Sequence, residues 1–134
     1  MHQFPIRVYY EDTDLAGIVY YANYLKFIER GRSEWLRDLG VDQNALKSEG
    51  LVFAVRRVEA DYLSPAVFDD QLIVETALGQ LGGSRIVMTQ DVRRGDRLLF
   101  RAEVTVVCVN LATGRAARIP AAVATALSPG PTPG

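Results

Sequence analysis

The hydrophobic pattern changes its period once along the chain, near Leu51. Before this point, apolar side chains recur every three or four residues from Tyr24 to Leu39, which predicts one amphipathic helix over residues 22–39. Beyond it the period is two, which is typical of strands. The expected strands span residues 51–63, 71–81, 84–94 and 97–110. Because one helix can cover one face of an antiparallel sheet, this order predicts an α+β fold.

Turn residues separate the expected strands. Gly82-Gly83 and Gly95-Asp96 are suited to tight hairpins, so neighbouring strands should be antiparallel. The other expected elements are a strand over residues 4–10, a helical turn over 42–48 and a helix over 121–127. We therefore expect one domain over residues 1–127 and a disordered tail over residues 128–134, whose composition offers little to pack.

The alternation within the strands predicts which side chains face the helix. In the first long strand this face is expected to carry Val52, Ala54, Val58, Ala60 and Tyr62. Gly31 lies within the apolar stripe of the helix, which suggests a close approach of helix and sheet. Some apolar side chains fall on the opposite face of the sheet and suggest contact with a partner subunit. These residues are Ile73, Leu99, Val107 and Val109.

Composition restricts the chemistry. The 134 residues carry a net charge of −1, which argues against nucleic-acid binding, and no apolar run is long enough to span a membrane. The N-terminus lacks the apolar core of a signal peptide, and the single cysteine, Cys108, fits a reducing cytoplasm. The only histidine is His2, at a terminus expected to be mobile. Mechanisms that need a Ser-His or Cys-His pair are therefore disfavoured, and a carboxylate is the expected reactive group.

An acidic loop precedes the helix and carries the candidate reactive groups. Glu11, Asp12 and Asp14 lie within four residues, shortly before the free N–H groups of the helix N-terminus. Gly17 allows the loop to turn or to approach a substrate closely. Asp14 could attack a carbonyl directly or activate a water molecule, whereas the structural alternative is that Asp12 and Asp14 only form Asx turns. A divalent-metal site built from Glu11, Asp12 and Asp14 is a further alternative, which we disfavour because the spacing of an EF-hand is absent. We expect no cofactor.

The segment from Tyr9 to Arg32 reads Y-Y-E-D-T-D-x-x-G-x-V-Y-Y-x-N-Y-L-x-x-x-E-R-x-R. It resembles the signature of the hotdog-fold 4-hydroxybenzoyl-CoA thioesterase family, and most closely the acyl-CoA thioesterase branch associated with the Tol–Pal cell-envelope system. The resemblance is dense from Arg7 to Gly40 and weaker beyond. It implies an antiparallel sheet wrapped around one central helix. It also implies homodimers or homotetramers with active sites at the subunit interface.

The resemblance also assigns roles to residues. The catalytic aspartate of the family falls on Asp14, and the backbone amide that holds the thioester oxygen falls on Tyr21. The Tol–Pal-associated branch usually carries His at the latter position, so the choice between aliphatic and aromatic acyl groups stays open. The expected substrate-binding residues are Gly17, Val19, Tyr20, Asn23, Tyr62 and Arg56. Asn23 could instead cap the helix or fix the loop, and Tyr62 could instead belong to the core.

Coenzyme A carries phosphates, so a basic rim is expected near the site. Arg56 is the first candidate, because it interrupts an apolar strand face. Other candidates are Arg57, Arg85, Arg93, Arg94, Arg115 and Arg118, whereas Glu29, Arg30 and Arg32 are interpreted as an exposed charged helix face.

Two functions remain at this stage. The first is hydrolysis of acyl-CoA thioesters. The second is a non-catalytic module that binds acyl-CoA, acyl carrier protein or an envelope-division partner. A hotdog dehydratase is disfavoured because such enzymes rely on a histidine.

Overall fold

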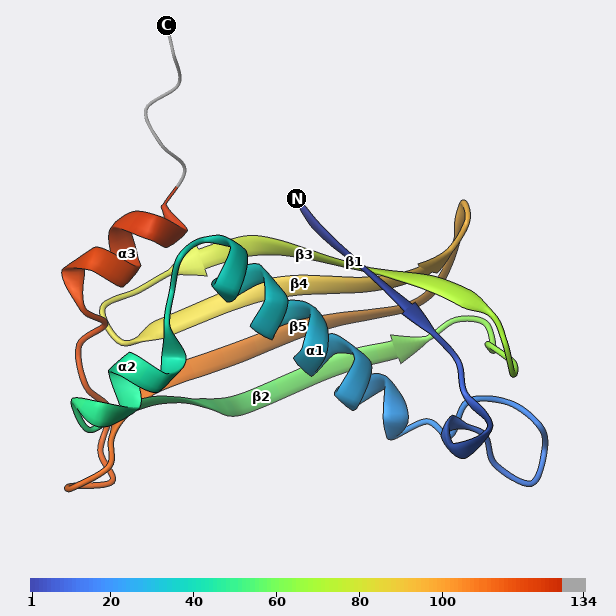
Figure 1. Cartoon of the computed structure of the whole chain (residues 1–134), viewed down its shortest axis with the longest axis horizontal. Coiled ribbons are helices and arrows are strands. Elements are labelled where there is room, and N and C mark those ends of the chain that lie inside the picture. The colour runs from blue at the N-terminus through green and yellow to red at the C-terminus, as the bar shows by residue number, and fades with distance from the viewer. Residues whose placement is uncertain (129–134) are drawn as a thin grey trace, which may run out of the picture.

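The computed structural model describes residues 1–128, with five strands and three α-helices. The strands are β1 (His2–Arg7), β2 (Leu51–Tyr62), β3 (Gln71–Leu81), β4 (Arg85–Arg94) and β5 (Arg97–Asn110). The helices are α1 (Asn23–Asp38), α2 (Gln43–Ser48) and α3 (Ala121–Leu127), with a 3-10 turn at Tyr10–Asp12. The strands form one antiparallel sheet in the order β1-β3-β4-β5-β2, and α1 lies across one face (Figure 1). This is the hotdog arrangement expected from the sequence.

The helix α1 supplies the centre of the hydrophobic core. Its buried residues are Tyr24, Phe27, Ile28, Gly31, Trp35 and Leu36. They repeat at the helical period, and they pack against side chains of alternating residues on the sheet. The backbone of α1 lies closest to β1, β3 and β4, so the helix lies off-centre, away from β2.

Gly31 marks the closest approach between helix and sheet. A Cβ atom at this position would lie 2.4 Å from Cγ1 of Val74, which is itself completely buried. No side chain larger than hydrogen fits there unless the backbones move apart. The expectation of a close approach is therefore confirmed.

The N-terminal strand differs from its predicted bounds. It covers His2–Arg7 rather than residues 4–10, because the chain turns into the 3-10 helix at Tyr10. His2 is part of the strand, and its Nε2 lies 2.7 Å from Oδ2 of Asp38 at the end of α1. The expectation of a mobile His2 was therefore wrong. The predicted tail, apart from Ser128, lies outside the described residues.

A β-bulge corrects the predicted face of β2. Val55 pairs with Val106 and Arg57 with Thr105, so Arg56 is the extra residue. Each such insertion exchanges the two faces of a strand. Leu51 and Phe53 therefore face the core before the bulge, and Val58 and Ala60 face it after the bulge, in place of the single set predicted. Periodicity alone could not reveal the change.

The predicted apolar patch on the outer face was also wrong in part. Leu99 is the extra residue of a second bulge, between β4 and β5, and it lies fully buried in the core. Val107 is buried as well, while Ile73 and Val109 are half-buried.

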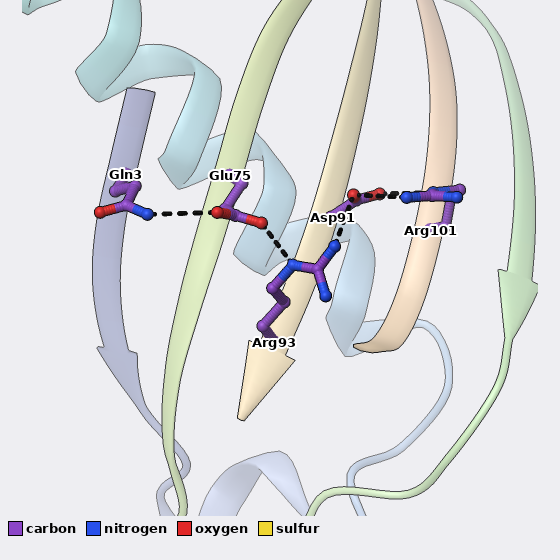
Figure 2. Close-up of polar contacts among 5 residues, drawn as sticks. All are labelled: Gln3, Glu75, Asp91, Arg93 and Arg101. Carbon is purple, nitrogen blue, oxygen red and sulfur yellow. Dashed lines mark hydrogen bonds and ion pairs between the residues drawn. The ribbon is translucent and has the colours of Figure 1, made fainter. Parts of the chain in front are cut away.

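Charged and polar side chains instead cross the outer face in a row, which Figure 2 shows in front of the sheet with α1 behind it. Gln3 donates to Glu75 at 3.1 Å, and Arg93 binds Glu75 at 2.5 Å. Arg101 donates twice to Asp91 at 2.9 Å. The Glu75 and Asp91 side chains are only 11% exposed. Removing one partner would leave a charge poorly solvated, which makes these pairs matter more than ordinary surface pairs.

Replacing Gly31 by alanine tests the close approach. Alanine favours a helix over glycine by about 1 kcal/mol. The clash with Val74 should nevertheless lower the free energy of unfolding by about 1–3 kcal/mol, as overpacked cores do. Urea unfolding measures the change.

The matched control is Gly83→Ala, because Gly83 has open space around its Cβ position and no positive φ. Its stability should change little, and Val74→Ala should recover part of the loss in Gly31→Ala. A Gly31→Ala protein as stable as the Gly83→Ala control would contradict the close approach.

Candidate active site

The loop between β1 and α1 is held by Asp12. Its carboxylate Oδ2 accepts a hydrogen bond from the N–H of Tyr9 at 2.8 Å. Its main-chain oxygen accepts two more, from Tyr20 N–H at 2.8 Å and from the Asn23 side-chain amide at 2.9 Å. Asp12 is buried, so these bonds fix the two ends of the loop together. Asp12 is thus structural, as expected, and Asn23 ties the loop to the first turn of α1.

The tip of the loop is a tight turn at Gly17. Gly17 has a φ of +81°, a conformation that glycine adopts without strain. Its N–H donates to the main-chain oxygen of Asp14 at 2.9 Å. The main-chain N–H of Asp14 donates in turn to the main-chain oxygen of Ile18 at 2.9 Å. Beyond the turn, the N–H of Val19 donates to the main-chain oxygen of Ala66 at 2.9 Å. This bond holds the loop against the segment that follows β2. The predicted turn at Gly17 is confirmed.

One carboxylate oxygen of Asp14 is hydrogen-bonded and the other is free. Its Oδ1 accepts a hydrogen bond from the N–H of Ala16 at 2.9 Å, which is the Asx turn considered from the sequence. Oδ2 has no hydrogen-bond partner among residues 1–128, and Asp14 is exposed in the single chain. The turn therefore fixes the orientation of the carboxylate and leaves one oxygen available for chemistry.

Tyr21 lies two residues before α1 begins. Within the described part of the chain its main-chain N–H donates no hydrogen bond, whereas its oxygen accepts one from the hydroxyl of Tyr62 at 3.0 Å. Free N–H groups at the positive end of a helix dipole attract developing negative charge. The Tyr21 N–H can therefore act as an oxyanion donor.

A cleft of about 310 Å³ opens beside Tyr21, and Asp14 is not part of its lining. Its lining consists of Ile18, Val19, Tyr21, Tyr24, Tyr62, Leu63, Ser64 and Pro65. The rings of Tyr24 and Phe100 stack at 4.9 Å, and Tyr62 meets Phe100 edge-on at 5.1 Å. Loop, helix start and the end of β2 thus form one largely apolar wall. The structure brings together Val19, Tyr21 and Tyr62 of the predicted site.

Three tyrosines at or near the cleft, Tyr20, Tyr24 and Tyr62, stay protonated at neutral pH. The pKa of Tyr20 is raised by a hydrogen bond and charge interaction with Tyr21, then by burial and by the charge of Asp14, which places Tyr20 near that carboxylate. Burial also raises the pKa of Tyr24 and of Tyr62. Their hydroxyls are therefore neutral hydrogen-bond donors.

Arg56 is not part of this arrangement. It is the exposed bulge residue of β2, six residues before Tyr62, and six residues of a strand span about 20 Å. Three other rim candidates form ion pairs instead: Arg57 with Glu59, Arg93 with Glu75, and Arg94 with Asp70. Within residues 1–128, no three His, Cys, Asp or Glu side chains converge as metal ligands would.

The chain matches the model of the thioesterase-like superfamily over residues 8–127. It belongs to this superfamily. It is 45% identical over 109 residues to "Acyl-CoA thioesterase YbgC" of Haemophilus influenzae, covering 81% of this chain and 80% of that protein. It is 43% identical over 111 residues to "Acyl-CoA thioester hydrolase YbgC" of Escherichia coli, covering 82% and 83%.

A solved structure supports the same membership. The crystal structure of a probable thioesterase from Bartonella henselae is 42% identical and superimposes with a TM-score of 0.84, covering 89% of this chain and 98% of that one. None of the helices among residues 1–128 has the length and hydropathy needed to cross a membrane.

Two features of this superfamily member were missed in the sequence. Asp70 accepts hydrogen bonds from Val67 N–H at 2.9 Å and Arg94 at 2.8 Å, and Arg94 also reaches the oxygen of Pro65 at 3.3 Å. These bonds hold the link that forms one wall of the cleft. The Asp69-Asp70 pair was the available signal. Arg32 is half-buried rather than part of an exposed helix face.

The Asn23→Ala substitution tests the anchoring of the loop. Losing the bond to Asp12 should lower the free energy of unfolding by about 1 kcal/mol. It should also speed hydrogen exchange at Tyr20 N–H, which donates to the same oxygen. Denaturant unfolding and exchange measurements check both effects.

Asn44→Ala is the matched control, since Asn44 is also in the first turn of a helix and its side chain forms no hydrogen bond in the described part of the chain. Both substitutions gain the same helix propensity. Equal stability of the two variants would show that Asn23 does not anchor the loop.

Proposed function

We propose that this protein hydrolyses acyl-CoA thioesters, with Asp14 as nucleophile or general base and Tyr21 N–H as oxyanion donor. The observation that carries the proposal is a free carboxylate oxygen on Asp14 and a free main-chain N–H on Tyr21, both on the segment before α1, with Tyr21 lining the cleft. The YbgC relatives from two bacteria, named as acyl-CoA thioesterase and hydrolase, support the substrate class.

The chemistry needs little beyond these two groups. In the direct route, Asp14 forms a bond to the thioester carbon and coenzyme A departs as thiolate, since a thiol with a pKa near ~8.5 is a good leaving group. Water then hydrolyses the resulting anhydride. In the other route, Asp14 removes a proton from a water molecule that attacks the same carbon. In both, the oxygen gains negative charge opposite Tyr21 N–H, a contact typically worth roughly 3 kcal/mol of barrier.

The walls of the cleft suit an apolar acyl group. Val19, Tyr24 and Tyr62 are the groups that an aliphatic chain or an aromatic ring would touch. Gly17 and Tyr20 flank Asp14 on the loop, and Asn23 acts through the loop rather than on the substrate.

We also propose that two copies pair through β2. This strand has twelve residues and lies at the edge of the sheet, where its outer main-chain groups are free to pair with another strand. Val55 and Tyr62 along it are 47% and 49% exposed. Pairing of two antiparallel β2 edges would form a continuous sheet with two-fold symmetry and would cover Asp14 from one side. The buried free thiol of Cys108 supports a cytoplasmic location.

The Asp14→Asn substitution tests the catalytic assignment. Asparagine retains the size and the acceptor oxygen of the Asx turn, but it cannot serve as nucleophile or base. Release of thiol from acyl-CoA esters should fall by roughly a hundredfold or more. A panel of aliphatic and aromatic acyl-CoA esters, with acyl carrier protein esters beside them, would define the acyl group and the carrier.

Glu11→Gln is the control, because Glu11 is an exposed carboxylate of the same loop. It should keep wild-type rates. Wild-type rates in a folded Asp14→Asn protein would reject catalysis by Asp14. Tight binding of acyl-CoA or acyl carrier protein without turnover by the wild type would favour the non-catalytic module.

Light scattering tests the assembly. We expect at least twice the 14.8 kDa mass of the chain at concentrations where the protein is fully active. Four times this mass would indicate that the dimers pair again. A fully active monomer would rule out the shared interface.

A further inference from the structure

A second cavity lies beneath α1 on the side of β2. Its volume is about 160 Å³. The apolar part of its lining is Leu36, Phe53, Val55, Ile86, Met88 and Val106. It exists because α1 packs over β1, β3 and β4 and leaves space above β5 and β2. The polar part of the lining is Glu29, Arg32, Ser33 and Gln43.

The guanidinium of Arg32 is incompletely satisfied. No carboxylate lies within ion-pair distance of it among residues 1–128, and its single hydrogen bond is a long one, 3.5 Å to Oε1 of Gln90. Burial lowers the pKa of Arg32, and the charge of Glu29 opposes this only in part. A guanidinium has five N–H donors and no acceptor. Its other donors reach solvent and are available to a ligand.

Gln90 positions this guanidinium. It is completely buried, and its amide donates to the oxygen of Ile28 at 2.8 Å and to Oγ1 of Thr76 at 3.0 Å. Both donors of the amide are used within the core, so Oε1 is directed at Arg32. Gln90 therefore holds the Arg32 guanidinium on the polar side of the cavity, beside Glu29, Ser33 and Gln43.

The cavity limits what can bind. An apolar cavity of about 150 Å³ can hold benzene, so this one has room for one six-membered ring or a chain of about five or six carbons. Burying Arg32 beside a purely apolar ligand would leave its donors unpaired, which is unfavourable. A ligand that carries an acceptor oxygen at its far end would pair with them.

The position of the cavity relative to Asp14 depends on the assembly. Within one chain, Phe53 and Tyr62 lie nine residues apart on β2, a separation of about 30 Å. If two β2 edges pair antiparallel over their whole length, Tyr62 of one subunit lies opposite Leu51 of the other. Phe53 of that second subunit is then only two residues further along, on a strand about 5 Å away.

We propose that the Arg32 cavity of one subunit receives the acyl group of a thioester bound at Asp14 of the other subunit. Arg32 selects acyl groups that carry a hydroxyl or a carboxylate oxygen at their far end. This inference rests on the proposed thioesterase function and on the β2 dimer.

The first test is a ratio of kcat/KM values for matched substrates. The pairs are hexanoyl-CoA with its 6-hydroxy and 6-carboxy counterparts, and benzoyl-CoA with 4-hydroxybenzoyl-CoA. The wild type should prefer the oxygenated member of at least one pair by about tenfold or more, the usual effect of a charge-assisted hydrogen bond. The hydroxyl and carboxyl arms identify which oxygen is preferred.

Arg32→Met should abolish this preference, and Arg32→Lys should weaken it because lysine keeps the charge but loses the planar fork. Arg30→Met is the control, since Arg30 is exposed on the same helix. It should leave the ratio unchanged. Arg32→Lys also covers the case in which Arg32→Met does not fold. An unaltered ratio in a folded Arg32 variant would overturn the inference.

The second test mixes two defective proteins. Asp14→Asn and Arg32→Met subunits are unfolded together in equal amounts and refolded. If Arg32 serves the site of the opposite subunit, each mixed dimer contains one complete site, so activity on the oxygenated substrate should recover to about one quarter of wild type. No recovery above the average of the two parents would contradict a shared site.

The outcomes separate the two proposals. Lack of thioesterase activity in the wild type would reject the function itself. Activity that depends on Asp14, but with a ratio unaffected by Arg32, would reject only the role of the cavity.

Discussion

The contact between Gly31 and Val74 determines how the rest of the molecule is arranged. A Cβ at Gly31 would lie 2.4 Å from Cγ1 of Val74, so the helix packs on the sheet too closely for any side chain larger than hydrogen. Gln90 reinforces this contact by binding the oxygen of Ile28. Because α1 is fixed there, over β1, β3 and β4, its first turn reaches the end of β2 and its far side leaves a cavity above β5.

The site depends on this placement and on one buried carboxylate. Asp12 closes the loop before α1 with three hydrogen bonds, and the loop then holds Asp14 in an Asx turn with one oxygen free. Of these two acidic residues, Asp12 has a structural role and Asp14 has the proposed chemical one. We infer that Asp14 can remain exposed in one chain because the second subunit completes its surroundings.

The sequence predicted the elements well because their causes are local. Apolar spacing identified α1 and the four long strands, and Gly17 identified the turn in the loop. The errors arose where the cause is not local. Bulges at Arg56 and Leu99 reverse the faces of β2 and β5, and they depend on the neighbouring strand. The burial of Arg32 follows from the off-centre packing of α1, which no spacing in the sequence reveals. The roles of Asp14 and Tyr21 remain predictions supported by geometry.

The most direct measurement is a crystal structure of the protein with a non-hydrolysable acyl-CoA analogue, in which a methylene group replaces the thioester sulfur. We expect the analogue's carbonyl oxygen within about 3 Å of the Tyr21 main-chain nitrogen and its carbonyl carbon facing Oδ2 of Asp14 at about 3–3.5 Å. An analogue bound with its carbonyl away from both groups, in every copy of the assembly, would contradict this expectation.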